Sequence, residues 1–245
     1  MFSYSNNIAL NLTNPKAARE LYEKAFDMKF QSEGKEGIHL KSQNMNFWLD
    51  QAEAGSTKVP EAFFEFLVEN SEEAKAKLTT LGFECLQTTL PNCYMMRDPM
   101  GVNWHLFQRK RGKGIVDTTG YNLTCIYVDE MEKSVKFYTE ILGFEKVRDM
   151  TPGALFKVGS EAEGSFLYLE GGRKKTPRPE TENTSENPMG SSCICLNAPS
   201  IKEAAAALKK IEVPFHRDYV EYAPTFAGFQ ILDPAGNIVE YAGKP

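Results

Sequence analysis

The chain has 245 residues, of which 42% are hydrophobic and 25% charged, so its composition excludes a disordered or collagen-like protein. The net charge of −5 argues against a nucleic-acid partner, which needs a basic surface. No apolar run has the length of a membrane helix, the first residues lack a secretory pattern, and five irregularly spaced Cys do not form a disulfide framework. We therefore expect a reduced, cytoplasmic protein with one large or two small domains.

Boundary residues and apolar patterns predict two strand-and-helix units in the first half. A helix beginning at Pro15 follows Asn14, where the missing N–H of proline has no partner to lose. A second helix follows Asn70, with Glu73 at the spacing of a capping box, and Gly82 stands where a left-handed residue ends a helix. In chain order we predict a strand over 8–12, a helix over 15–26, strands over 37–41, 45–49 and 63–68, a helix over 71–81, and strands over 93–97 and 103–107.

The second half repeats these signals after a basic, Gly-containing linker over 109–117. A third helix follows Asp129, with Glu132 three residues on, and a fourth follows Ser200, with Glu203 three residues on. In chain order we predict a strand over 122–128, a helix over 130–142, strands over 154–158, 165–169 and 192–196, a helix over 201–211, and strands over 228–232 and 237–241. The Pro- and Glu-rich stretch 171–190 indicates a flexible insertion, or alternatively a lid.

Short motifs recur between the halves. Asp98-Pro99-Met100-Gly101 returns as Asp233-Pro234-Ala235-Gly236, and Leu21-Tyr22 with Phe26 returns as Phe137-Tyr138 with Leu142. In the Asp-Pro-x-Gly turn, proline fixes φ, aspartate caps the turn and glycine takes a conformation that other residues avoid. The sequence therefore predicts one unit, strand–helix–strand–strand–strand, written four times in an α+β chain.

This arrangement, carried by 128–144 and 233–240 with weaker copies at 21–26 and 98–105, resembles the vicinal oxygen chelate superfamily. That superfamily includes glyoxalase I, bleomycin-resistance proteins, fosfomycin-resistance enzymes and extradiol dioxygenases. The resemblance implies two tandem glyoxalase-like halves, 1–108 and 118–245, whose curled mixed sheets form cups for a ligand or metal. Two units of one half could share a cup, or units could pair across halves.

The resemblance also implies four metal-ligand positions in each cup. Within the first half these positions hold Asn7, Trp48, Phe63 and His105, and within the second half Leu123, Tyr168, Ser191 and Glu240. Pairing across halves would combine Asn7, Trp48, Ser191 and Glu240 in one cup and the other four in the second. In either case each cup has one strong ligand, whereas a divalent site uses three or four. We expect no metal or other cofactor, with His105 and Glu240 as the weak candidates if a divalent metal binds.

Aromatic residues at the vacated positions indicate a cavity for a planar or apolar molecule. Trp48 and Tyr168, with Phe63 nearby, would line it, and His105 or Glu240 would supply a polar anchor. The alternative is that these aromatics fill the cup as core. Cys193 and Cys195 lack further ligands and are expected in the core. No catalytic residue is assigned, and the candidate ligand-binding residues are Trp48, Phe63, His105, Tyr168, Ser191 and Glu240.

Three functions remain open on this basis. The first is a metal-free protein that binds a small aromatic or amphipathic molecule, as a bleomycin-resistance or glyoxalase-like protein would. The second is a divalent-metal-dependent lyase or ring-cleaving dioxygenase, and the third is a non-catalytic scaffold with filled cups. Because one chain holds four units, we expect a monomer or a homodimer.

Overall fold

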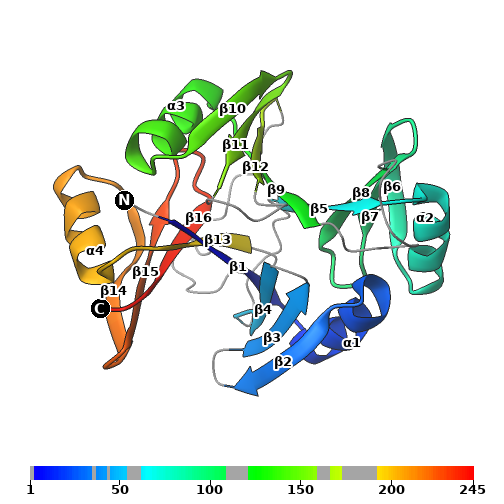
Figure 1. Cartoon of the computed structure of the whole chain (residues 1–245), viewed down its shortest axis with the longest axis horizontal. Coiled ribbons are helices and arrows are strands. Elements are labelled where there is room, and N and C mark those ends of the chain that lie inside the picture. Colours follow the sequence, from blue (N-terminus) through cyan, green and yellow to red (C-terminus); the bar gives the residue numbers. More distant parts are fainter. Residues whose placement is uncertain are drawn as a thin grey trace.

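The computed structural model describes residues 3–34, 37–42, 45–53, 62–108, 121–158, 166–172 and 192–245. Four units follow one another along the chain and surround the centre of the molecule (Figure 1). The first half contains β1 (Ser3–Leu12), α1 (Pro15–Phe26), β2 (Lys29–Gly34), β3 (Gly37–Ser42) and β4 (Met45–Gln51), then β5 (Ala62–Val68), α2 (Ser71–Thr80), β6 (Glu84–Leu90), β7 (Cys93–Arg97) and β8 (Asn103–Gln108). The second half contains β9 (Tyr121–Tyr127), α3 (Met131–Lys136), the π-helical turn η1 (Phe137–Ile141), β10 (Glu145–Met150), β11 (Gly153–Lys157) and β12 (Phe166–Glu170), then β13 (Ser192–Asn197), α4 (Ile201–Lys210), β14 (Phe215–Ala223), β15 (Phe226–Leu232) and β16 (Ile238–Gly243).

Each of the two sheets joins units from opposite halves. We call sheet A the one ordered β14-β15-β16-β13-β1-β4-β3-β2, and sheet B the one ordered β10-β11-β12-β9-β5-β8-β7-β6. In sheet A the first and fourth units meet where β1 runs antiparallel to β13, and in sheet B the second and third meet at β5 and β9. Of the two arrangements that the sequence left open, the units therefore adopt the one in which they pair across halves.

The two large hydrophobic cores follow the halves rather than the sheets. One core contains only residues between Ile8 and Leu106, and the other only residues between Ile126 and Tyr241. Trp104 lies at the centre of the first core, where its ring is 4.4 Å from that of Phe26. The two units of one half therefore pack face to face, while the sheets connect the halves. The division of the chain into domains stays a prediction, since the predicted linker 109–117 lies outside the described residues, as does 173–190 of the predicted insertion.

The two recurring sequence motifs touch each other in both halves. The Tyr22 hydroxyl of α1 donates to Asp98 Oδ2 over 2.7 Å, and the Tyr138 hydroxyl of η1 donates to Asp233 Oδ2 over 3.0 Å. All four of these side chains are buried. Burial raises the pKa of both tyrosines and of Asp98, while hydrogen bonds from Trp104 and Tyr22 act to lower the pKa of Asp98. Each pair joins the helix of one unit to the Asp-Pro-x-Gly turn of the next.

The predicted helices are confirmed, with one correction. Asn14, Asn70 and Ser200 accept backbone N–H groups at the starts of α1, α2 and α4, as capping residues do. The third helix differs, because its N-cap is Glu130 rather than Asp129 and makes no side-chain cap. Its last turn is the π-helical η1, and this wider turn carries Tyr138. Gly82 takes the expected left-handed φ of +89° after α2.

All twelve predicted strands are present, eleven of them within about two residues and β1 with a start five residues earlier than predicted, but four further strands were missed. These are β2, β6, β10 and β14, the strand that follows the helix in each unit and forms an outer edge of a sheet. The side chains of β2 and β10 are exposed along their whole length. A strand that is wet on both faces has no apolar alternation, so its sequence carries no periodic signal.

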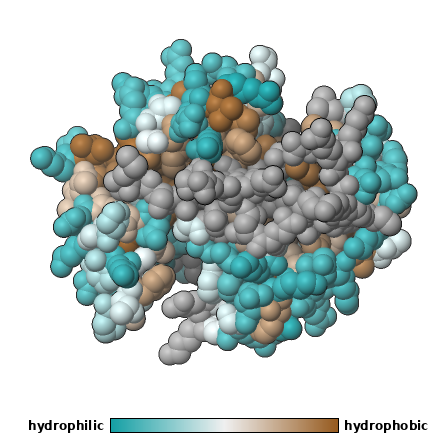
Figure 2. All heavy atoms as spheres, in the orientation of Figure 1, coloured by the Kyte–Doolittle hydropathy of each residue, from teal (hydrophilic) through white to brown (hydrophobic). Residues whose placement is uncertain are grey.

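The described residues on the face drawn in Figure 2 are mainly hydrophilic. Figure 2 shows hydrophobic side chains on this face only in small separate groups among the described residues. Within the described part of the chain, no helix has both the length and the apolar character that a bilayer crossing needs. Single exposed apolar side chains of this kind are ordinary on folded proteins.

We predict that Tyr138→Phe lowers the free energy of unfolding by about 1.5–3 kcal/mol, because the buried Asp233 carboxylate loses a hydrogen-bond donor. Urea unfolding followed by circular dichroism measures the loss. Tyr219→Phe serves as the control, since its hydroxyl bonds Glu221 in solvent, and we expect a change within about 0.5 kcal/mol. Equal losses in the two variants would show that the Tyr–Asp pair does not hold the half together.

Candidate functional site: a cavity on sheet A

Sheet A carries a cavity of about 780 Å³ on the face turned away from the two large cores. This volume lies within the range of sites that hold small organic ligands. Its lining comes from the first and fourth units, on strands at opposite ends of the chain. Lining residues include Asn7, Ala9 and Asn11 of β1, Trp48 and Asp50 of β4, Cys195 of β13, Arg217 and Tyr222 of β14, Gln230 of β15 and Glu240 of β16.

A row of polar side chains crosses the cavity wall at one level. Strand register places Asn7 beside Cys195, Cys195 beside Glu240, Glu240 beside Gln230, and Gln230 beside Arg217. Neighbouring strands lie about 5 Å apart, so these five side chains project side by side from five adjacent strands. The row therefore offers a continuous line of hydrogen-bonding groups to anything in the cavity.

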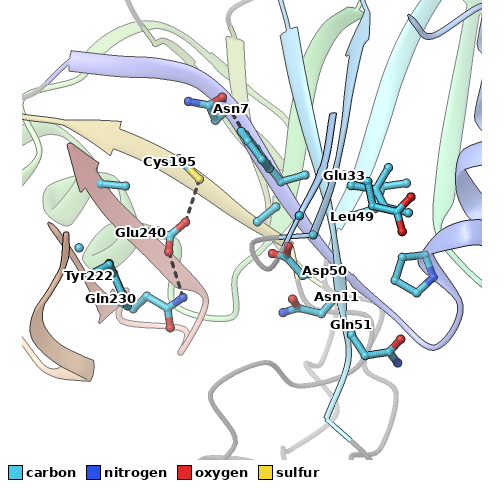
Figure 3. Close-up of a pocket in the computed structure, with 18 of the residues that line it drawn as sticks. Asn7, Asn11, Glu33, Leu49, Asp50, Gln51, Cys195, Tyr222, Gln230 and Glu240 are labelled. Carbon is cyan, nitrogen blue, oxygen red and sulfur yellow. Dashed lines mark hydrogen bonds between the residues drawn. The ribbon is translucent and has the colours of Figure 1, made fainter. Parts of the chain in front are cut away.

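Glu240 is the centre of this row. Its Oε1 accepts from the Arg217 guanidinium over 3.1 Å and from Gln230 Nε2 over 3.5 Å, and its Oε2 accepts from Cys195 Sγ over 3.2 Å. Figure 3 shows the carboxylate between Cys195 and Gln230 on the cavity wall. The Arg217–Glu240 ion pair is largely buried, so it is screened by solvent less than a surface pair is. These contacts hold the carboxylate in place.

Trp48 forms an aromatic surface beside this row. Its ring stacks on His39 at 4.4 Å, with 11° between the ring planes, and its indole N–H donates to Asn7 Oδ1 over 3.2 Å. His39 Nε2 in turn donates to Asn46 Oδ1 over 2.9 Å, since an amide oxygen only accepts. Trp48 is thus fixed by stacking on one face and by a hydrogen bond at its edge. A fixed indole is suited to stacking against a planar molecule.

The face of sheet B turned away from the cores has a different character. A small apolar cluster there contains Phe63, Met95 and Cys125, against which Tyr168 packs. Burial of the Tyr168 hydroxyl raises its pKa to about 12. Amid these side chains, His105 Nδ1 lies 2.7 Å from Glu65 Oε2, and each of the two residues is 7% exposed. This face therefore holds a buried ionisable pair among aromatic and aliphatic groups.

Comparison with known families agrees with this architecture. A model of the Glyoxalase/Bleomycin resistance protein/Dioxygenase superfamily matches residues 120–241. The chain belongs to this superfamily. The α+β architecture of four βαβββ units, predicted from the sequence, is confirmed. A comparison with curated proteins found no match.

Solved structures of the superfamily share the fold along nearly the whole chain. A single-residue variant of glyoxalase I from Zea mays superposes with a TM-score of 0.73 at 15% identity, over 99% of this chain and 92% of that one. A proposed dioxygenase from Bacillus subtilis superposes with a TM-score of 0.68 at 12% identity, over 99% of this chain and 85% of that one. At such identities the likeness shows the fold alone.

The metal-ligand positions of the superfamily do not suit a metal in this chain. In sheet A, Asn7 is occupied by the indole N–H of Trp48, and Glu240 is engaged by Arg217 and Cys195. In sheet B, Phe63 has no donor atom for a divalent ion. Among the described residues, no group of three or more His, Cys, Asp or Glu side chains is arranged to hold one. At these positions the donors that remain are Glu240 in sheet A and His105 in sheet B, and His105 is already bonded to the carboxylate of Glu65.

The structure separates the residues proposed from the sequence. Trp48 and Glu240 line one cavity on sheet A, whereas Phe63, His105 and Tyr168 lie together on sheet B. Ser191 lies outside the described residues. The expectation that Trp48 and Tyr168 line one cavity, with Phe63 nearby, is wrong, because β4 and β12 belong to different sheets. The Cys195 side chain is buried as expected but also lines the cavity; that of Cys193 is outside the described set.

Sequence reasoning missed four of the polar residues around these sites. Glu65 carried a usable signal, because a carboxylate between Phe64 and Phe66 faces the opposite side of the strand from a core. Arg217 and Gln230 lie on β14 and β15, and the pairing of these strands with β16 inside the fourth unit brings both side chains beside Glu240. His39 stood alone in the sequence, and only strand register brings it to Trp48.

We predict that Glu65 and His105 are energetically coupled. His105→Leu alone leaves a buried carboxylate without its 2.7 Å partner and lowers the free energy of unfolding by about 3 kcal/mol. The double variant with Glu65→Leu should lose less than the two single variants together, by about 1–3 kcal/mol. Urea unfolding of all four proteins tests this. The exposed Lys146–Asp149 pair is the control, and additive losses at Glu65 and His105 would contradict the coupling.

Proposed function

We propose that this protein binds a small aromatic or amphipathic molecule in the sheet A cavity, without a catalytic metal. The observation that carries the proposal is the cavity of about 780 Å³ with a fixed indole beside a row of polar groups. Ligand sites of this size combine apolar walls with a few polar groups that orient the ligand. Trp48 supplies the first of these features, and Glu240 with its partners supplies the second.

The side chains that would contact a ligand are already held in position in the free protein, and this supports binding. Trp48 is held by His39 and Asn7, and Glu240 by Arg217 and Cys195, so a ligand would meet side chains that are already positioned. Less side-chain freedom is then lost when the ligand binds. Tyr222 and Phe226, whose ring centroids are 5.9 Å apart, add aromatic surface on the β14–β15 hairpin. These rings lie at the exposed side of the cavity, where they would cover an incoming molecule.

Two ion pairs line the cavity together with the carboxylate of Asp50, and this arrangement disfavours an anionic ligand. Arg217 neutralises Glu240 at 3.1 Å, and Lys16 pairs with Glu33 at 3.3 Å. A ligand carboxylate would meet Glu240, and a ligand ammonium would compete with Arg217 for it. We therefore propose a neutral or weakly polar aromatic molecule as the ligand class.

The solved relatives named above comprise a glyoxalase I and a proposed dioxygenase. A lyase or ring-cleaving dioxygenase activity is accordingly the alternative, with Glu240 or His105 as the starting ligand for a divalent metal. The donor set around both residues favours the metal-free proposal instead. A scaffold with filled cups is disfavoured on sheet A by the cavity itself.

The setting we propose is a reduced, cytoplasmic one. Cys85, Cys93, Cys125 and Cys195 are free thiols, as expected where disulfides do not persist. A monomer or homodimer and the absence of a nucleic-acid partner belong to the same proposal, the latter because of the net charge of −5.

We predict that Trp48→Ala abolishes ligand binding on sheet A. Naphthalene and indole should raise the melting temperature of the wild-type protein and not that of the variant, because the stacking surface is lost. Differential scanning fluorimetry measures the shift. Phe30→Ala is the control, since Phe30 is partly exposed and lies outside the cavity lining. A wild-type protein that no aromatic compound stabilises would favour the filled scaffold.

We predict that purified protein carries less than a stoichiometric amount of any divalent metal, and that a chelator leaves its melting temperature and aromatic-ligand binding unchanged. The reason is the lack of a suitable donor set around Glu240 and His105. Elemental analysis by mass spectrometry provides the measurement. One equivalent of a divalent ion that is lost in Glu240→Ala would overturn the metal-free proposal and support the enzyme.

A further inference from the structure

Two buried polar atoms on the cavity wall have no hydrogen-bond partner. They are Gln230 Oε1 and Arg217 Nε, on residues that face each other across β14 and β15 and both line the cavity. Gln230 is only 3% exposed, so bulk water does not satisfy its oxygen. Buried polar groups in native proteins are nearly always paired, and an unpaired one indicates a missing water, ion or ligand group.

Glu240 explains why these two atoms are left over. A carboxylate only accepts hydrogen bonds, so it turns the amide nitrogen of Gln230 and a terminal guanidinium nitrogen of Arg217 toward itself. The amide oxygen of Gln230 and the Nε–H of Arg217 then remain, one an acceptor and the other a donor. The orientation of the Gln230 amide is thus set by chemistry rather than by an arbitrary choice between oxygen and nitrogen.

We propose that the sheet A ligand is a planar heterocycle with a lactam edge, whose N–H donates to Gln230 and whose C=O accepts from Arg217. This rests on the proposed function and names its ligand class. A lactam presents one donor and one acceptor side by side in the plane of its ring, and these are complementary in type to the acceptor of Gln230 and the donor of Arg217 on adjacent strands. The same ring plane gives the flat surface that Trp48 can stack on.

The required adjustment of the side chains is small. The terminal torsion of glutamine is broad, so the Gln230 amide can tilt its oxygen into the cavity. Its bond to Glu240 is long, at 3.5 Å, while Arg217 and Cys195 hold the carboxylate more closely. Glu240 therefore stays in place as the ligand binds. A carboxylate ligand would lack the N–H and would meet Glu240, so the pattern selects a neutral lactam.

Three matched probes test this inference: carbostyril, which is a bicyclic lactam, N-methylcarbostyril, which keeps the C=O but lacks the N–H, and naphthalene, which lacks both. Titrations followed by protein NMR give the dissociation constants. We expect carbostyril to bind about tenfold more tightly than N-methylcarbostyril, because the methylated probe leaves Gln230 Oε1 buried and unpaired.

Two variants locate the effect. Gln230→Met keeps the shape of the side chain and removes the acceptor, and Arg217→Lys keeps the charge beside Glu240 and removes the Nε–H. Each should bring the affinity for carbostyril down to that for N-methylcarbostyril while naphthalene binding stays within twofold. Equal weakening of all three probes would mean that the residue only shapes the cavity and would overturn the inference.

The outcomes separate this inference from the proposed function. Naphthalene binding that depends on Trp48, together with equal affinities for the two carbostyrils, would keep the proposed function and overturn the lactam class. No binding of any probe to the wild-type protein would overturn both. A crystal structure of the complex in which one water joins Gln230 Oε1 to Arg217 Nε and the lactam contacts neither would overturn the inference as well.

Discussion

The buried tyrosine–aspartate hydrogen bond is the contact on which the arrangement of each half depends. Tyr22 reaches Asp98 and Tyr138 reaches Asp233, and each aspartate also organises the turn that leads into β8 or β16. These two strands carry His105 and Glu240 into the faces that lie away from the cores. A contact outside the cavity lining thus sets the direction of the strands that carry both polar sites. The motifs recur in the sequence because the same tyrosine–aspartate contact joins the two units of each half.

The hydrophobic cores and the hydrogen-bonded sheets connect different pairs of units. Hydrophobic cores bind neighbouring units within a half, whereas backbone hydrogen bonds in the sheets bind units of different halves. The cavity consequently belongs to neither half alone, since its wall needs β1 from one end of the chain and β16 from the other (Figure 1). A change that separates the halves would open the cavity even with both cores intact.

The parts of the fold that have local causes could be predicted from the sequence. Asn70 and Ser200 cap helices through bonds three residues away, and Gly82 takes a left-handed φ, so a single stretch of chain is enough to find each. The edge strand β14 has no local sequence signal, because most of its side chains are exposed to solvent. The site was predictable only in part for a related reason. Glu240 follows from its distance to the Asp-Pro-x-Gly turn, but Arg217 reaches Glu240 through strand pairing between β14, β15 and β16 that no local pattern encodes.

The two sheets also show how one scaffold came to hold two different sites. Counted back from their helix caps, Cys195 of β13 and Glu65 of β5 are equivalent positions, and register pairs them with Glu240 and His105. In sheet A the polar residue of β16 therefore bonds a side chain on the neighbouring β13, and in sheet B the polar residue of β8 bonds one on the neighbouring β5. Where the partner is the small Cys195, the Arg217 guanidinium also reaches Glu240. Where the partner is Glu65, aromatic side chains surround the hydrogen-bonded Glu65–His105 pair. The size and charge of one residue on the neighbouring strand thus distinguish the polar cavity wall of sheet A from the aromatic face of sheet B.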